Sequence, residues 1–462
     1  MNLHFFQLTL QTQVSLHPKC SKLKLTHLIF ADDLILFVRG DLPSVQGAVH
    51  LLNLFTNWSG LRANISKTEI YFGGVSSAVK ALILQHTGFT EGSFPFRYLR
   101  IPLNSCRNST EVYGTLVTKI QNSLLHWSKP GRVQILNSVI FGITNFWCAS
   151  ALLPKAILKR IIKICKDFFL HVDEGCRKQV FHSWAAVCRP AQEGGLGVKE
   201  ILSWNKALLA KWLWLLENDT SGIWAQWNRA YILSTGSIWT ISVKDRYSEC
   251  LCSILAVKEE IVARTGSIVA ATQILNSWVR HGKFQVSTTY HWFRDKGETV
   301  YWFKALQGNA IVPKHKTCAI LAASKHLPMV DLLISRGLIL INRCVLCQVA
   351  VESHEHLFFS CTFSQDVWNA LLQWMHLCSR SVSLWTELRW MAQTKGQRHW
   401  KNMWRKACLA AAIYYLWQER NQRIFTGHES SYAALLSQIQ FTVKHRLLAC
   451  NSLPSCLVAH LA

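Results

Sequence analysis

Four residues that can bind a soft metal ion lie close together in the C-terminal half of the sequence, and they constrain its fold more than any other feature. Cys344 and Cys347 are followed by His356 and Cys361 in the pattern C-x2-C-x8-H-x4-C. Three thiolates and one imidazole at this spacing suit tetrahedral Zn²⁺, and a closed set of four ligands indicates a structural site. His354 fits the spacing as an alternative third ligand. The competing interpretation is a set of ordinary buried cysteines.

Two adjacent aspartates, Asp32 and Asp33, interrupt two runs of β-branched and aromatic residues between positions 26 and 37. The pattern predicts a β-hairpin with both carboxylates at its turn. Adjacent like charges repel each other, and a divalent cation would remove that cost. Polymerases hold two Mg²⁺ ions about 3.5–4 Å apart through oxygen ligands, so the hairpin indicates a nucleotidyl-transfer site. The alternative is that both aspartates are simply turn residues.

Several short motifs accompany the aspartate pair along the chain, and motifs in the right order are more specific than any one of them. They are Ser59-Gly60-Leu61, Asn64, Ser66-Lys67-Thr68, residues 98–103, Trp127, Gly131-Arg132, residues 194–197 and residues 204–211. With these motifs the chain resembles the polymerase protein of plant LINE-type, non-LTR retrotransposons over nearly its whole length.

The resemblance implies an RNA-directed DNA polymerase ancestry, with RNA and DNA template–primer as partners and Mg²⁺ as cofactor. It gives Asp32 the role of direct Mg²⁺ ligand and Asp33 a supporting role. Lys67 occupies the region where polymerases place a lysine that assists the departure of pyrophosphate. The alternative for Lys67 is a surface lysine on an edge strand.

The cysteine and histidine cluster resembles the zinc-binding domain of the same family. A histidine-leucine-phenylalanine-phenylalanine run in the family favours His356 over His354 as the third ligand. Glu352 matches a family acid, which implies that it supports the ligands from outside the metal's own shell. Zn²⁺ is therefore the expected structural cofactor.

The polymerase site lacks parts that the family needs. Residues 1–31 contain no Asp or Glu, whereas the family uses a further aspartate on an earlier strand, and its fingers also precede the hairpin. Arg100 stands where the family's primer-gripping strand usually has glycine, and arginine is a poor substitute there. We expect a protein truncated at the N-terminus and inactive as a polymerase. The other hypotheses are a non-catalytic, zinc-dependent nucleic-acid-binding protein and a decayed relic.

Lysine and arginine outnumber aspartate and glutamate by 50 to 26, which gives a net charge of +24. Such a surface attracts polyanions and its binding weakens as salt rises, so RNA and DNA are the expected partners. No particular protein partner is indicated. One predicted helix carries several cations on one side. This side either contacts the backbone of a nucleic-acid duplex or is simply exposed to solvent. These cations are Lys155, Lys159, Arg160, Lys163 and Lys166.

The cysteines and the apolar segments bear on localisation. The 16 cysteines are scattered along the chain, and no signal peptide precedes them, which favours a reducing intracellular compartment, either nucleus or cytoplasm. The uncharged stretch between Arg132 and Lys155 contains Gln134, Asn137 and Asn145. These polar groups would be costly in lipid, so we expect a buried helix there and no membrane association.

Local patterns predict individual elements of an α+β fold. We expect a helix at 42–58 with Pro43 in its first turn and Gly60 at its end, a strand at 67–72, a turn at 193–197, and an amphipathic helix through 409–417 that ends near Gly427. The expected domains are a palm remnant at 1–104, a mostly helical thumb and connection at 105–234, a divergent linker at 235–286, a small zinc-binding domain at 287–377 and a basic helical C-terminal extension at 378–462.

Overall fold

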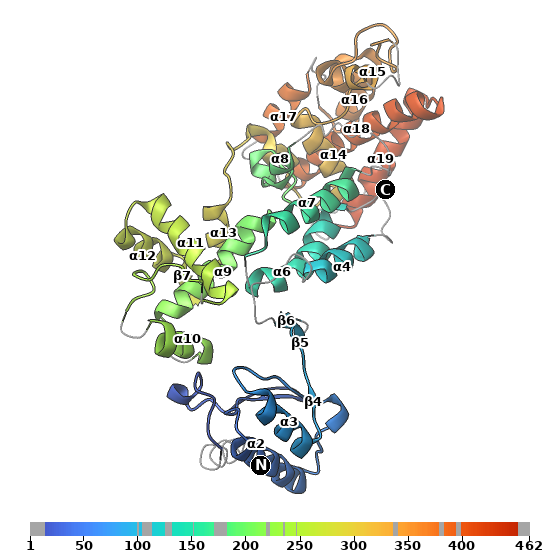
Figure 1. Cartoon of the computed structure of the whole chain (residues 1–462). Coiled ribbons are helices and arrows are strands. Elements are labelled where there is room, and N and C mark those ends of the chain that lie inside the picture. Colours follow the sequence, from blue (N-terminus) through green and yellow to red (C-terminus); the bar gives the residue numbers. More distant parts are fainter. Residues whose placement is uncertain are drawn as a thin grey trace. The chain divides into compact units, whose positions relative to one another are not determined.

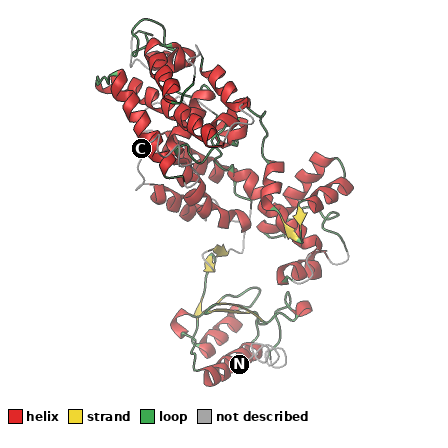
Figure 2. Ribbon diagram, turned by 180° about the vertical axis from the view of Figure 1, so that it is seen from behind, coloured by secondary structure: helices red, strands yellow, loops and turns green. Residues whose placement is uncertain are grey.

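A computed structural model gives the fold, which Figures 1 and 2 show from opposite sides. The described residues are mostly helical, and their strands form four separate two-stranded sheets. The chain divides into two compact units: unit 1 is Met1–Thr115, Asn145–Pro154 and Trp204–Trp292, and unit 2 is Leu116–Thr144, Lys155–Ser203 and Phe293–Ala462. The structure describes residues 14–98, 101–103, 113–124, 132–150, 152–170, 183–218, 222–233, 236–245, 247–335, 341–377, 383–393 and 399–450.

The predicted hairpin is present in unit 1. Strand β1 (His27–Phe30) pairs antiparallel with β2 (Asp33–Leu36), and Phe30 faces Asp33 across the turn. Ala31, in the turn, has a φ of +52°, which is the positive range that tight hairpin turns use. The structure therefore confirms the hairpin, with one aspartate in the turn and the other at the start of β2.

The predicted helix after the hairpin is also present, as α2 (Leu42–Ser59). The Asp41 carboxylate accepts a hydrogen bond from the Ser44 N–H at 2.9 Å and so caps the N-terminus, where Pro43 lies in the first turn. Gly60, with a φ of +74°, ends the helix, because glycine adopts this conformation without strain. Further elements here are η1 (Ser21–Leu23), η2 (Ile65–Lys67), β3 (Glu69–Ile70), α3 (Ser77–Thr87), β4 (Thr90–Glu91), β5 (Phe96–Tyr98) and β6 (Ile101–Leu103).

These strands do not assemble into one sheet among the residues that the structure describes. β3 pairs with β4 in parallel, and β5 pairs with β6 antiparallel. The strand predicted at 67–72 is confined to β3, and Arg100 lies outside the described residues. The described residues are thus mostly helical with few short strands.

The motif at 204–211 has a packing role in unit 1. Asn205 is fully buried; its side chain donates to the Cys148 carbonyl at 2.7 Å and accepts from the Leu153 N–H at 2.9 Å. Lys206 forms an ion pair with Glu260 at 2.7 Å. These bonds join α9 (Ile201–Asn218) to the chain after α6 (Phe141–Ser150) and to α11 (Glu249–Thr265).

Residues 235–286, for which we predicted a divergent linker, contain regular structure. The helices in this segment bury apolar side chains, among them Leu255, Ile261 and Leu275. The elements within it besides α11 are α12 (Ile268–Ser277), β7 (Val279–Arg280) and β8 (Lys283–Phe284); α10 (Ile223–Asn228) and η6 (Arg229–Leu233) precede it, and α13 (Val286–Phe293) begins at its last residue.

The turn predicted at 193–197 is present in unit 2 and is held by a buried ion pair. The Glu193 carboxylate accepts hydrogen bonds from Arg294 at 2.7 Å and from the Gly297 N–H at 2.8 Å. A Cβ on Gly195 would lie 2.0 Å from the Arg189 carbonyl oxygen, so only glycine fits there. Nearby elements are α4 (Gly114–Leu124), α5 (Arg132–Ile135), η4 (Leu136–Ile140), α7 (Lys155–Leu170), α8 (Trp184–Cys188) and η5 (Ala191–Glu193). Within the described residues no helix combines the length and apolarity that a membrane crossing requires.

One hydrophobic core runs through the C-terminal part of unit 2, from Trp302 to Leu447. Helices α14 and α19 both pack against α18, whose apolar side chains include Leu409 and Ile413, and Figure 1 shows these helices grouped together. α18 ends before Gly427, which has a φ of +67°, as predicted. The core therefore joins residues from both 287–377 and 378–462. The elements are η7 (Tyr301–Leu306), α14 (Pro313–Ala323), α15 (Val330–Ser335), η8 (His356–Ser360), α16 (Thr362–Trp374), α17 (Leu384–Gln393), α18 (His399–Thr426) and α19 (Tyr432–Leu448).

Candidate metal centre

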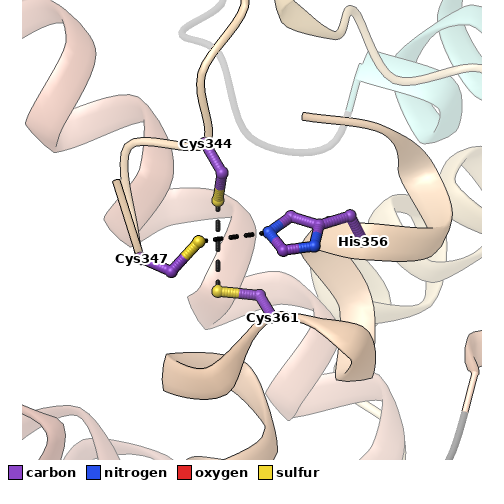
Figure 3. Close-up of side chains that lie close together, drawn as sticks. All are labelled: Cys344, Cys347, His356 and Cys361. Atoms are coloured by element: carbon purple, nitrogen blue, oxygen red, sulfur yellow. Dashed lines mark hydrogen bonds between the residues drawn. The ribbon is translucent and has the colours of Figure 1, made fainter. Parts of the chain in front are cut away.

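The four predicted zinc ligands converge in unit 2, as Figure 3 shows. The ligand atoms of Cys344, Cys347, His356 and Cys361 all lie within 4.8 Å of one another. The Cys347 Sγ lies 3.3 Å from the His356 Nε2, and the Cys344 Sγ lies 4.0 Å from the Cys361 Sγ. Ligands bound tetrahedrally to zinc at about 2.3 Å for sulfur and about 2.0 Å for nitrogen lie roughly 3.5–3.8 Å apart. The cluster therefore has the size and donor set of a zinc site.

The first two ligands come from a tight turn. The Gln348 N–H donates to the Cys344 carbonyl at 2.7 Å, and the Cys344 N–H donates to the Ala350 carbonyl at 2.8 Å. Gln348 has a φ of +58°, which closes the turn. The backbone N–H groups of Leu346 and Cys347 point at the Cys344 sulfur. Such bonds favour the thiolate that a metal requires.

The last two ligands come from a short kinked segment that leads into α16. The Cys361 N–H donates to the His356 carbonyl at 2.6 Å. Phe359 has a φ of +73° and is buried, with its ring centroid 4.8 Å from that of Trp368. A positive φ is strained for a bulky residue, and here the buried ring stabilises it. The kink turns His356 and Cys361 towards the same point.

The charge state of the cluster follows from this geometry. Cys344 donates a hydrogen bond to Cys361, which raises the pKa of Cys344, and burial raises it further. The same bond lowers the pKa of Cys361, which also lies at the N-cap of α16, where the helix dipole favours an anion. Zn²⁺ would hold both sulfurs as thiolates.

An arginine on α18 holds the cysteine turn from outside. Arg423 donates to the carbonyls of Val345 and Leu346, each at 3.3 Å. The same guanidinium donates to the Glu419 carboxylate at 2.8 Å, and Glu419 also accepts the Ser430 N–H at 2.8 Å. Burial opposes ionisation of Glu419, but these hydrogen bonds outweigh it, so its pKa is lowered. The turn between Cys344 and Cys347 is thereby fixed to α18.

Glu352 supports the segment that carries the ligands through a buried ion pair. Its carboxylate accepts two hydrogen bonds from Arg420, at 2.6 and 3.1 Å, and one from the Val330 N–H at 2.9 Å. Both side chains are almost completely buried, and the Arg420 guanidinium also lies 4.7 Å from the Trp417 ring centroid. Glu352 therefore ties the zinc segment to α18.

The described residues that could hold a metal include His356 and do not include His354. Sequence reasoning missed Glu419, Arg420 and Arg423, which come from beyond the cluster. One signal was present: Glu419 and Arg423 have the i,i+4 spacing of a helical ion pair.

The polymerase candidates form no comparable site. Asp32 and Asp33 are exposed at the hairpin tip, and Lys67 is exposed at the end of η2. Within the part of the chain that the structure describes, no hydrogen bond or ion pair joins Lys67 to either aspartate, and no third ligand residue joins the pair in a metal-holding group. The described residues therefore give no support to a two-metal Mg²⁺ site.

Three cysteines and one histidine in a closed, largely buried cluster define a structural zinc-type site. Residues 284–368, which contain the whole cluster, match the family of zinc-binding domains in reverse transcriptase. A protein of Arabidopsis thaliana, named as a candidate ribonuclease H protein, is 27% identical to this chain over 129 residues. The alignment covers 27% of this chain and 21% of that relative, so this chain spans well under two thirds of the relative's length.

Proposed function

We propose that this chain is a retrotransposon-derived protein of the reverse-transcriptase type, in which Zn²⁺ holds the C-terminal region and a basic surface binds RNA or DNA. The observation that carries the proposal is the Cys344, Cys347, His356 and Cys361 cluster inside a segment that matches the zinc-binding domain of reverse transcriptase. A closed Cys₃His set contributes to folding and leaves no open position for catalysis.

The basic helix α7 supports nucleic-acid binding. Lys155, Lys159 and Lys163 recur every four residues and are exposed, whereas Ile157 and Ile161 on the other side are buried. A row of exposed cations on a helix anchored by its apolar side suits the spacing of phosphates. The net charge of +24 has the same sign.

Binding of this kind depends on salt, and a fluorescence anisotropy titration of zinc-loaded protein with a labelled RNA tests it. We expect the affinity to fall steeply as salt rises, and the slope to become shallower by about 1–2 in the Lys159→Ala/Lys163→Ala variant. Lys119→Ala/Lys401→Ala removes the same charge from α4 and α18 and is the matched control. Absence of binding at low salt would contradict the proposal.

The ancestral activity that we propose is RNA-directed DNA polymerisation, with residues 1–104 as a palm remnant and 105–234 as a thumb and connection. The order of the motifs supports this descent. Asp32 and Asp33 lack a third metal ligand among the described residues, so we propose that this chain does not polymerise. A primer-extension assay on an RNA template should show no incorporation; incorporation that disappears in Asp32→Asn would contradict this.

The ribonuclease H name stays with the Arabidopsis thaliana relative, because the alignment covers only 21% of its length.

A further inference from the structure

The surface formed by η7 and α17 in unit 2 carries cations and an aromatic ring but no exposed carboxylate. Glu387, the acidic residue of α17, is buried in the core. The exposed side chains of these two elements are Tyr301, Lys304, Thr386, Arg389 and Gln393. This surface therefore has a local positive charge that its own elements do not neutralise.

Two pairs of a cation and an aromatic ring lie at this surface. The Arg389 guanidinium lies 5.3 Å from the ring centroid of Tyr301, and the Lys325 Nζ lies 5.5 Å from the ring centroid of Trp385. Trp385 and Arg389 are one helical turn apart on α17, so they lie on the same side of it. Tyr301 is 47% exposed, which leaves its ring accessible.

Lys325 occupies a backbone position that favours glycine. The His326 N–H donates to the Leu321 carbonyl at 2.6 Å and the Lys325 N–H donates to the Ala322 carbonyl at 3.0 Å. These two bonds form the left-handed cap that commonly ends a helix with glycine, and Lys325 has a φ of +57°. The Lys325 side chain therefore stands where glycine would fit with less backbone strain, so its replacement by glycine tests the side chain without a cost to the fold.

We propose that this surface, defined by Tyr301, Lys304, Lys325, Trp385 and Arg389, binds single-stranded nucleic acid. A base would stack on Tyr301 while the three cations contact phosphates, which is the combination that single-strand binding uses. A duplex offers its backbone but keeps its bases stacked inside, so it would engage the cations without the ring. This proposal rests on the proposed nucleic-acid binding, to which it adds a preference for single strands and the five residues of this surface.

Anisotropy of the full-length, zinc-loaded chain with a fluorescein-labelled oligouridylate and with an RNA duplex of equal length tests this. We expect Tyr301→Ala to weaken single-strand binding by at least about five-fold and to leave duplex binding within two-fold. Tyr301→Phe, which keeps the stacking ring, should bind as the wild type does. Tyr432→Ala, which removes an exposed tyrosine from α19 in the same unit, should change neither affinity.

Lys325→Gly separates a binding role from a structural one. Glycine relieves the backbone strain, so this variant should unfold at the same temperature or higher while it binds the single strand several-fold more weakly. If the wild type binds both probes but Tyr301→Ala and Lys325→Gly match it, this inference fails and the proposed function stands. If the wild type binds neither probe, the proposed function itself fails. Equal losses on both probes would also overturn the single-strand assignment.

Discussion

Replacement of Arg423 by methionine should weaken zinc binding although Arg423 is not a ligand. Arg423 is the α18 side chain that holds the carbonyls of Val345 and Leu346, the two residues between Cys344 and Cys347. Methionine fills a similar volume but donates no hydrogen bond, so the cysteine turn would lose its attachment to α18. The two sulfurs would then have to be ordered by the metal alone.

The structure sets the size of the effect. Two hydrogen bonds of 3.3 Å are weak ones, worth roughly 0.5–1.5 kcal/mol each. Their sum corresponds to a zinc affinity about 10–100-fold lower, which is the usual cost of losing an outer hydrogen bond at a metal site. Stability should fall more, by about 3–5 kcal/mol, because the fully buried Glu419 carboxylate loses its ion-pair partner.

Competition with a chromophoric zinc chelator measures the affinity, and thermal unfolding of the zinc-loaded chain measures the stability. Arg446→Met is the matched control, because Arg446 donates to the Asn309 carbonyl at 2.7 Å and contacts none of the four ligands. It should leave zinc affinity unchanged. Arg423→Met with wild-type zinc affinity would refute the argument that α18 positions the cysteine turn.

Two further predictions concern buried charge in unit 2. Glu352→Gln and Arg420→Met should each lower the free energy of unfolding by about 3–5 kcal/mol, because each leaves a buried group without its charged partner. The double variant should lose less than the sum of the two single losses. Additive losses in urea unfolding would contradict the pairing. Burial lowers the pKa of His315 from 6.5 to about 4, so the folded state favours the neutral ring. The contribution of the neutral His315 ring to the free energy of unfolding is complete above pH 6.5 and is lost as the pH falls towards 4. On acidification His315→Gln should therefore lose about 3 kcal/mol less free energy of unfolding than the wild type. Identical pH profiles of the two proteins would exclude this.

The sequence predicted the metal cluster well because all four ligands belong to one short segment. Spacing alone left His354 and His356 open, and the resemblance favoured the one that the structure brings to the cysteines. The deciding feature is the kink at Phe359, a buried residue with positive φ, which no local propensity indicates.

Features that depend on distant residues were not predictable in the same way. The Arg423 contact with the cysteine turn joins residues far apart in the sequence, as does the pairing of Glu352 with Arg420. Two runs of β-branched and aromatic residues around Asp32 and Asp33 predicted the hairpin. Strand pairing beyond a hairpin is non-local, and the structure shows no larger sheet among the described residues. Residues 235–286 carry no motif that we recognised, although two capped helices lie there. Ser248 and Ser267 cap the N-termini of α11 and α12. Serine at these positions was the sequence signal that could have predicted the two helices.

The central claim is that Cys344, Cys347, His356 and Cys361 hold one zinc ion. Elemental analysis of the purified full-length chain, with the zinc content of three variants compared with that of the wild type, tests it most directly. We expect one zinc per chain in the wild type and in His354→Ala, and loss of zinc in Cys347→Ser and His356→Ala. A wild-type chain without zinc, or zinc that is lost in His354→Ala and retained in His356→Ala, would contradict it.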